Sequence, residues 1–304
     1  MPVLSGQTRV IPMTKIRTAI ATALQRSKQQ VPHFYETIDI DMEAINYLRE
    51  RLNERLEKEN VRLSIMDFIY KAVAGALLRH PALNARFNAD KGEITQYGDV
   101  NLGIAVAIPD GLIVPVLRGI NQMGLRDIRL RTTDLFDRAR AQRLKREEQS
   151  EATFSISALG TYGIRDFSAI INPPEVGILA VGAAEKRPVV RDNQIVARTT
   201  MSVTLSCDHR AVDGATAAEF LRTLKEILEE PGLLLVQRLG LFGWRVTGSN
   251  VWRWSVHHRR LRRAARRADH GCGRRRDAEH QLRGRARRSH RDRRARPAES
   301  RRGD

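Results

Sequence analysis

Apolar residues along positions 13–236 follow two different periods, and the alternation between them limits the possible folds more than any other feature of the sequence. Residues 153–159 and 201–206 alternate apolar and polar side chains as half-buried strands do, whereas residues 217–228 are apolar at helical spacing. Residues 176–182 are apolar throughout, which is typical of a strand buried on both faces. The pattern predicts an α/β protein, a two-layer structure with helices on one face of a mixed sheet.

The remaining segments fit the same two layers, with capping residues and turns at their ends. Thr14 can cap a first helix, which ends before Val31-Pro32 because the residue before a proline disfavours helical conformation. After it the sequence predicts, in order, a strand at 34–40, a helix that Asp41 caps and that extends to about residue 59, a helix at 65–78 capped by Ser64, a hairpin of 101–109 and 112–117 around Asp110-Gly111, a charged helix at 124–148 and a turn at 191–193.

The positive charge of the chain is concentrated at its C-terminal end. The whole chain has 53 Lys and Arg against 35 Asp and Glu, a formal net charge of +18. Residues 237–304 alone carry 22 Arg, no Lys and 6 acids, so residues 1–236 are close to neutral at +2. We therefore predict three parts: an N-terminal arm (1–12), one domain with a sizeable core (13–236) and an Arg-rich tail (237–304).

The Arg-rich tail allows two interpretations. Dense arginine binds nucleic-acid phosphates with an affinity that falls as salt rises. Arginine without any lysine is, however, an odd balance for a selected basic segment, and it suits a non-native extension such as a frameshifted end. We favour the second interpretation, expect the tail to be disordered for want of apolar residues, and expect no nucleic-acid partner.

The positions of the cysteines and histidines limit which cellular compartment and which kinds of site are expected. Cys207 and Cys272 lie in different parts of the chain, so no disulfide framework is indicated and a reducing compartment fits. We expect no membrane association and a cytoplasmic protein, with the mitochondrial matrix as the alternative. His33 and His80 have ordinary structural explanations, no two of the three domain histidines share a close spacing with cysteine or carboxylate ligands, and no metal site is expected.

The most informative polar segment is Asp208-His209-Arg210, which is followed by Asp213-Gly214 and lies between an apolar strand and a helix. Catalytic side chains concentrate on such connections. A neutral imidazole with a pKa of about 6.5 is a suitable general base for a thiol with a pKa of about 8.5. A histidine beside charged residues can equally be structural, and Asp213 can either cap the helix or pair with an arginine, so the pattern alone does not decide.

Five sequence blocks, which include residues 208–214, occur in the same order as in a known family and make the interpretation of His209 more specific. The motif at 208–214 resembles the HxxxDG signature that chloramphenicol acetyltransferases share with the catalytic domain of the dihydrolipoamide acyltransferases of 2-oxoacid dehydrogenase complexes, and the DHRxxDG form is that of the second group. The similarity spans about residues 9–236. The other blocks, in chain order, are 12–21, 111–116, 153–160 and 171–182.

The resemblance implies a chloramphenicol acetyltransferase-like, trimer-forming fold and assigns three catalytic residues. His209 matches the general base that deprotonates the thiol of coenzyme A, and Ser157 matches the serine whose hydroxyl stabilises the tetrahedral oxyanion. Asp213 matches the acid of the motif, with an orienting role and with Arg17 or Arg26 as its expected partner. Histidine and serine would come from neighbouring chains. Acyl transfer of this kind needs no cysteine, so we assign Cys207 no catalytic role.

The resemblance also predicts substrates and partners. Residues 163–175 and 205–210 look most like the acetyltransferase of pyruvate dehydrogenase complexes, so acetyl is the expected acyl group. Coenzyme A and a lipoyl group would be the substrates, with the lipoyl-bearing domain expected outside this chain. A homotrimer, a core of 24 or 60 chains, and the 2-oxoacid decarboxylase and dihydrolipoamide dehydrogenase components are the expected partners.

Three alternatives remain open on the sequence. The transferred group could be succinyl or branched-chain, or the chain could be an antibiotic O-acetyltransferase of the same fold, although the blocks outside the motif disfavour the latter. A catalytically silent core protein is the third alternative. Such proteins commonly lack the catalytic histidine, whereas this chain has both His209 and Ser157.

Overall fold

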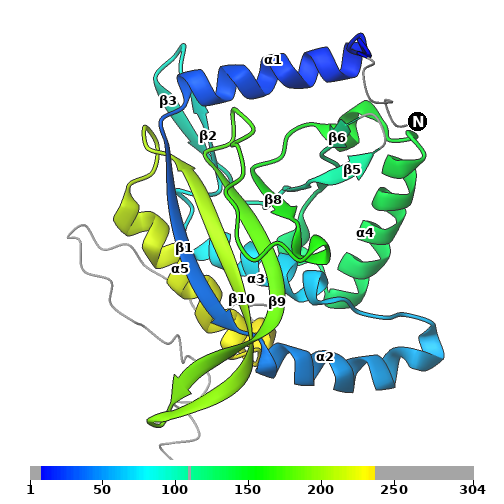
Figure 1. Ribbon diagram of the computed structural model, residues 1–304, viewed down its shortest axis with the longest axis vertical. Coiled ribbons are helices and arrows are strands. Elements are labelled where there is room, and N and C mark those ends of the chain that lie inside the picture. The colour runs from blue at the N-terminus through cyan, green and yellow to red at the C-terminus, as the bar shows by residue number, and fades with distance from the viewer. Residues whose placement is uncertain (1–7, 109–110, 237–304) are drawn as a thin grey trace, which may run out of the picture. The chain divides into compact units, whose positions relative to one another are not determined.

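A mixed six-stranded sheet organises the protein (Figure 1). The computed structural model describes residues 8–108 and 111–236. In spatial order the sheet consists of β1 (His33–Asp41), β10 (Gln194–Asp208), β9 (Gly177–Arg191), β8 (Phe154–Ala158), β4 (Leu102–Ile104) and β7 (Val116–Leu117). Neighbouring strands run antiparallel except at β9·β8 and β8·β4, which are parallel. The predicted mixed α/β architecture is confirmed.

Two short hairpins and the helices complete the fold. The hairpins are β2 (Ala85–Asn88) with β3 (Glu93–Gln96), and β5 (Val106–Ile108) with β6 (Gly111–Ile113). The α-helices are α1 (Lys15–Gln30), α2 (Glu43–Leu56), α3 (Ile65–Arg79), α4 (Leu125–Arg140), α5 (Gly214–Glu229) and α6 (Leu233–Val236). Short 3-10 turns occur at Glu57–Glu59, Ile120–Gln122, Arg146–Gln149 and Gly160–Tyr162.

The main core lies between one face of the sheet and the helices α3 and α5 (Figure 1). Alternate residues of the strands point into it, and Phe154 of β8 and Phe220 of α5 place their ring centroids 5.8 Å apart. Helix α3 is buried along most of its length, which explains why its sequence is apolar on nearly every side. The apolar patterns at 153–159, 176–182, 201–206 and 217–228 therefore correspond to elements that contact this core.

Several element ends agree with the local signals, and one differs. Thr14 accepts a hydrogen bond from Arg17 N–H at the start of α1, and Ser64 forms a capping box with Asp67 at the start of α3. Helix α2 begins one residue later than predicted because Met42 is its N-cap, although the carboxylate of Asp41 still accepts the N–H of Glu43 (3.0 Å).

The long charged helix predicted at 124–148 is wrong in its second part. Helix α4 ends at Arg140, Gln142 has a positive φ of 55°, and the chain then folds back. Arg138 binds Glu148 through two nitrogens, 2.6 and 2.8 Å from the carboxylate oxygens, and this pair holds the returning segment against the helix. A run of charged residues has no feature that distinguishes a continuing helix from such a return.

The two longest strands form a hairpin that extends beyond the rest of the sheet (Figure 1). Its turn lies at Asp192 and Asn193, whose φ values are both positive (49° and 60°), as a tight type I′ turn requires. The predicted turn at 191–193 is confirmed, but β9 is longer than the apolar run at 176–182. Its second half is mostly exposed and mostly polar, so no extended apolar run marks it.

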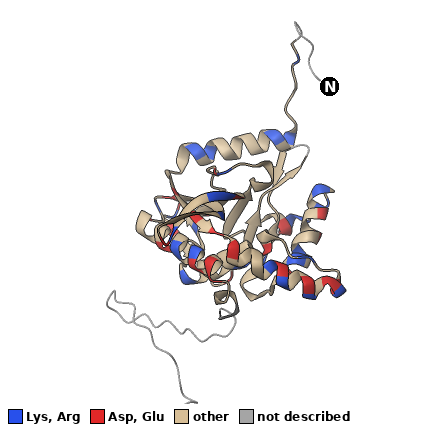
Figure 2. Ribbon diagram, turned by 60° about the horizontal axis from the view of Figure 1, so that its bottom comes forward, with Lys and Arg blue, Asp and Glu red and all other residues tan. Residues whose placement is uncertain are grey.

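Basic and acidic residues are interspersed on α2 and α4, whereas α1 carries basic residues and no acidic ones (Figure 2). Within the residues described by the structure, no helix combines the length and the apolar character needed to cross a membrane. The Arg-rich tail lies outside the described residues, and the limits of the predicted domain at 13 and 236 stay a prediction.

Candidate active site

His209 is exposed and lies one residue beyond β10, in the turn that leads to α5. Its backbone N–H donates to the carbonyl oxygen of Pro32 (3.1 Å), and its ring contacts the ring of Phe34, with centroids 4.7 Å apart. Both contacts come from the start of β1, because β1 and β10 pair in antiparallel register and His33 is opposite Asp208. The backbone of His209 is therefore fixed while its imidazole faces solvent.

An ion pair closes the turn around His209. Asp208 is buried, and its carboxylate accepts hydrogen bonds from Nε and Nη2 of Arg210 at 2.9 and 2.7 Å. The Arg210 guanidinium lies 4.4 Å from the ring centroid of Phe87. Because both neighbours of His209 are held in this way, the turn has little freedom to move the imidazole.

Asp213 is the N-cap of α5. Its carboxylate accepts the backbone N–H of Thr216 at 2.8 Å, and this bond is the main reason that the pKa of Asp213 lies below its ordinary value, with the nearby His209 as a smaller cause. Of the two roles considered from the sequence, the structure shows the cap. Among the described residues of the single chain, neither Arg17 nor Arg26 forms an ion pair with Asp213, and the side chain of Arg26 binds Gln30.

Ser157 lies on β8, opposite Ala180 of β9. Phe154 and Ile156 point into the core, so the alternation of a strand places Ser157 on the other face of the sheet, where it is half-buried. No hydrogen bond to its hydroxyl is formed within residues 8–108 and 111–236. The hydroxyl is therefore available to a substrate oxygen.

The register of the sheet separates Ser157 from His209 within one chain. Ser157 pairs with Ala180, which pairs with Thr204, so the row that contains Ser157 crosses β10 five residues before His209. Ser157 and His209 are thus two strand spacings apart across the sheet and five residues apart along a strand. Their Cα atoms are therefore separated by roughly 19 Å. One acyl carbon cannot contact both side chains at that separation, and a single chain therefore does not assemble the predicted pair.

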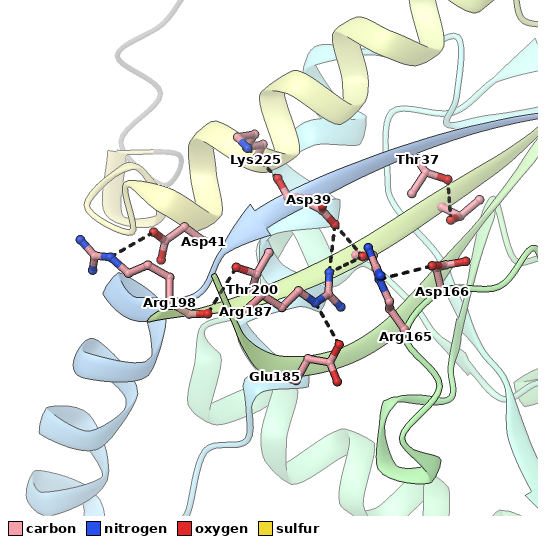
Figure 3. A network of polar contacts seen from close by, with 12 residues as sticks. Thr37, Asp39, Asp41, Arg165, Asp166, Glu185, Arg187, Arg198, Thr200 and Lys225 are labelled. Carbon is pink, nitrogen blue, oxygen red and sulfur yellow. Dashed lines mark hydrogen bonds and ion pairs between the residues drawn. The ribbon is translucent and has the colours of Figure 1, made fainter. Parts of the chain in front are cut away.

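Polar side chains of β1, β9 and β10 line one face of the sheet (Figure 3), and the strand register places Ser157 on the same face. Asp39 of β1 accepts hydrogen bonds from Ser202 Oγ (2.6 Å) and from Arg187 Nη1 (3.2 Å), and Arg187 also binds Glu185. The hydroxyls of Thr37 and Thr204 are 2.9 Å apart in the same row as Ser157. The sheet thus has one apolar face against the helices and one polar face.

Phe34 and Glu36 are neighbours of the site that the sequence alone did not indicate. Phe34 contacts the His209 ring only because β1 and β10 pair, and no local signal gives that register. Glu36 lies on the same face of β1, with Oε1 3.2 Å from where a Cβ at Gly214 would stand, and burial raises its pKa. In the sequence, Glu36 is recognisable only as an acidic residue in an alternating strand, and this pattern does not indicate that it lies close to α5.

The surroundings of Cys207 and His80 indicate structural roles for both side chains. Cys207 is buried in the main core, and burial raises the pKa of its thiol. The ring of His80 binds the hydroxyl of Thr223 at 2.7 Å. In the described part of the chain, no three His, Cys, Asp or Glu side chains gather as a metal site would require.

Residues 5–236 match the model of the family described as 2-oxoacid dehydrogenases acyltransferase (catalytic domain). Two curated relatives carry the name dihydrolipoyllysine-residue acetyltransferase component of pyruvate dehydrogenase complex. The one from Rickettsia felis is 42% identical over 229 residues, which are 75% of this chain and 55% of the relative. The one from Zymomonas mobilis is 39% identical over 227 residues, 75% of this chain and 51% of the relative. The chain spans about half the length of these relatives.

Solved structures are similar over the same region. The dihydrolipoamide acetyltransferase of Azotobacter vinelandii, whose study concerned the role of a serine, a histidine and an asparagine in its catalytic mechanism, has a TM-score of 0.73 and 32% identity over 77% of this chain and 98% of that chain. The cubic core of a pyruvate dehydrogenase multienzyme complex also has a TM-score of 0.73, with 31% identity and the same coverage. This chain therefore belongs to the catalytic-domain family of the 2-oxoacid dehydrogenase acyltransferases.

Proposed function

We propose that this chain is the catalytic domain of a dihydrolipoamide acetyltransferase, which moves an acetyl group from acetyl-dihydrolipoyl to coenzyme A in a pyruvate dehydrogenase complex. The observation that carries the proposal is the exposed imidazole of His209 on a turn fixed by Pro32 and by the Asp208–Arg210 pair. The names of the curated relatives favour acetyl over succinyl or branched-chain groups. These relatives are bacterial, and we place the activity in the bacterial cytoplasm.

The reaction needs a base, an oxyanion donor and no covalent enzyme intermediate. His209 takes the proton of the coenzyme A thiol, and the thiolate attacks the thioester carbonyl of the acetyl-dihydrolipoyl group. The Ser157 hydroxyl donates a hydrogen bond to the tetrahedral oxyanion. When the intermediate collapses, the bond from carbon to the dihydrolipoyl sulfur breaks, and protonated His209 returns its proton to that sulfur.

The spacing of the three residues supports their roles. In the Azotobacter enzyme, the serine and the histidine are 52 residues apart and the asparagine follows the histidine by four. Ser157 and His209 have the same separation, and Asp213 stands four residues after His209, where the Azotobacter enzyme has asparagine. Asp213 orients the His209 turn through its cap on α5.

A second copy of the chain completes the site in this proposal. The separation of roughly 19 Å within one chain requires that Ser157 of one copy meets His209 of another. Helix α1 and the residues before it offer a surface for such a contact, because Ile11, Met13 and Ile16 are 70%, 54% and 48% exposed. A closed trimer would repeat one such contact three times.

The wider assembly follows from the same family. We propose that trimers build a core of 24 or 60 chains, that a lipoyl group on another domain delivers the acetyl group, and that 2-oxoacid decarboxylase and dihydrolipoamide dehydrogenase bind to the complex. The similarity to a cubic core of a pyruvate dehydrogenase complex supports this part of the proposal.

Acetyl transfer between acetyl-coenzyme A and free dihydrolipoamide tests the proposal. We expect His209→Ala to lower kcat on the order of 100- to 10,000-fold, because the general base is lost. Ser157→Ala should lower it on the order of 100-fold or more. His80→Ala is the control, since His80 contacts α5 and not the site. Equal activity of wild type and His209→Ala would overturn the proposed mechanism.

A further inference from the structure

Residues 169–172 have no regular secondary structure, yet side chains from three other elements hold their backbone. Ser206 Oγ of β10 donates to the carbonyl oxygen of Ala169 (2.8 Å), and Ser27 Oγ of α1 donates to that of Ile171 (2.6 Å). The N–H of Ile171 donates to Nε2 of His33 in β1 (3.1 Å). Segment 169–172 is therefore attached to the fold by polar side chains and not by strand pairing.

His33 is the link between segment 169–172 and the rest of the fold. Because Nε2 accepts a hydrogen bond from Ile171, that nitrogen carries no proton, and the ring proton must be on Nδ1. Nδ1 lies 2.8 Å from the carbonyl oxygen of Val31, to which it donates. Both ring nitrogens are thus used, and the two bonds together define one tautomer and one orientation of the ring.

The attachment is buried, so its polar groups cannot exchange their partners for water without cost. Ser27 and Ser206 are 1% and 0% exposed, and Ile171 packs in a small apolar cluster with Val31 and Ile178. A buried polar group that loses its partner destabilises its surroundings more than an exposed one does. The cluster and the hydrogen bonds consequently form one local unit.

The same end of β1 holds the His209 turn. Pro32, the residue before His33, accepts the His209 N–H, and Phe34, the residue after it, contacts the His209 ring. His33 is opposite Asp208 in the register of β1 and β10. A shift of the β1 start would therefore move both the backbone and the ring environment of His209.

From this arrangement we propose that His33 is a positioning residue for the reaction: its doubly hydrogen-bonded ring joins segment 169–172 to the start of β1 and thereby fixes the turn that carries His209. His33 does not touch the reacting atoms. Its catalytic consequence rests on the proposed function, whereas the coupling of segment 169–172 to the His209 turn does not.

Hydrogen exchange of the assembled protein, read by mass spectrometry, tests the coupling without reference to activity. In His33→Leu, which keeps bulk but has no ring nitrogens, peptides covering 168–173 and 208–212 should exchange on the order of tenfold faster than in wild type. Peptides from α3 should not change. His33→Gln, whose side-chain oxygen can accept the Ile171 N–H, should restore most of the protection. His80→Leu is the matched control, because it removes another half-buried histidine that does not contact segment 169–172.

Steady-state kinetics of the same variants test the catalytic consequence. His33→Leu should lower kcat on the order of 10- to 100-fold with little change in KM for coenzyme A, since small displacements of a catalytic group act on the chemical step. Ser27→Ala, a milder change, should act in the same direction on both readouts and serves if His33→Leu does not fold. Unchanged exchange at 208–212 in both variants would overturn the coupling. Normal kcat with accelerated exchange would overturn the positioning role. An inactive wild type with accelerated exchange in the variant would contradict the proposed function and leave the coupling supported.

Discussion

Glu175 is a carboxylic acid whose ionisation is opposed by burial. It is 3% exposed, burial raises its pKa from 4.5 to about 7, and Oε1 accepts a hydrogen bond from Asn172 (2.9 Å). Between these two pH values the folded protein holds this proton and the unfolded chain releases it. The contribution of Glu175 to the free energy of unfolding is therefore greatest below about pH 4.5 and falls as the pH rises to about 7.

Glu175→Gln should remove this pH dependence, because the amide stays neutral and still offers an oxygen to Asn172. We expect the free energy of unfolding of the variant, relative to wild type, to rise between pH 4.5 and 7 by up to roughly 3 kcal/mol. Denaturant unfolding at fixed protein concentration measures it. A difference that stays constant across this range would show that Glu175 does not keep its proton in the folded protein.

Substitutions of Asp213 can distinguish its role as the N-cap of α5 from a role of its negative charge. Asparagine caps a helix about as well as aspartate, so Asp213→Asn should leave Tm and acetyl transfer close to wild type. Asp213→Ala loses the bond from Thr216 N–H and should lower Tm by about 2–4 °C, a typical result for a lost cap in a domain of this size. Inactivity of the Asn variant at normal Tm would show instead that the carboxylate charge is required.

At the scale of elements, local sequence signals predicted the caps and turns that depend on neighbouring residues. They failed where a contact with a more distant segment determines the structure. The caps at Thr14 and Ser64 and the turn at 191–193 were predicted because their hydrogen bonds or φ values depend on a few adjacent residues. The end of α4 was not, since the Arg138–Glu148 pair that folds the chain back joins residues ten positions apart. For the site, the family resemblance assigned His209 and Ser157 from two separate sequence blocks, but the distance between them required the strand register.

A close crossing at Gly182 gives a prediction for β9. A Cβ at this position would stand 1.9 Å from the carbonyl oxygen of Arg165, because residues 164–165 cross directly over the strand and Ile164 accepts the N–H of Ala183 (2.8 Å). Gly182→Ala should therefore displace that segment and lower the free energy of unfolding by at least about 1–3 kcal/mol. Gly98→Ala, where no atom lies within 4 Å of the added carbon, is the control. Equal stability of the two variants would contradict this packing.

At the scale of the whole molecule, the two faces of one sheet have different roles. The apolar face and the helices α3 and α5 form the core, and the polar face carries Ser157. The end of β10 presents His209 roughly 19 Å away. The active unit in the proposed mechanism must therefore contain more than one chain, although each chain carries all three of the proposed catalytic side chains.

Complementation between two inactive variants tests this requirement most directly. His209→Ala and Ser157→Ala are co-expressed with different affinity tags, and trimers that carry both tags are isolated and assayed for acetyl transfer. If the site is shared, mixed trimers should recover about a third of wild-type activity, because every trimer that contains both variants has one of its three interfaces formed by an intact serine and an intact histidine. Activity no higher than that of the separate variants would show that the site is not shared between chains.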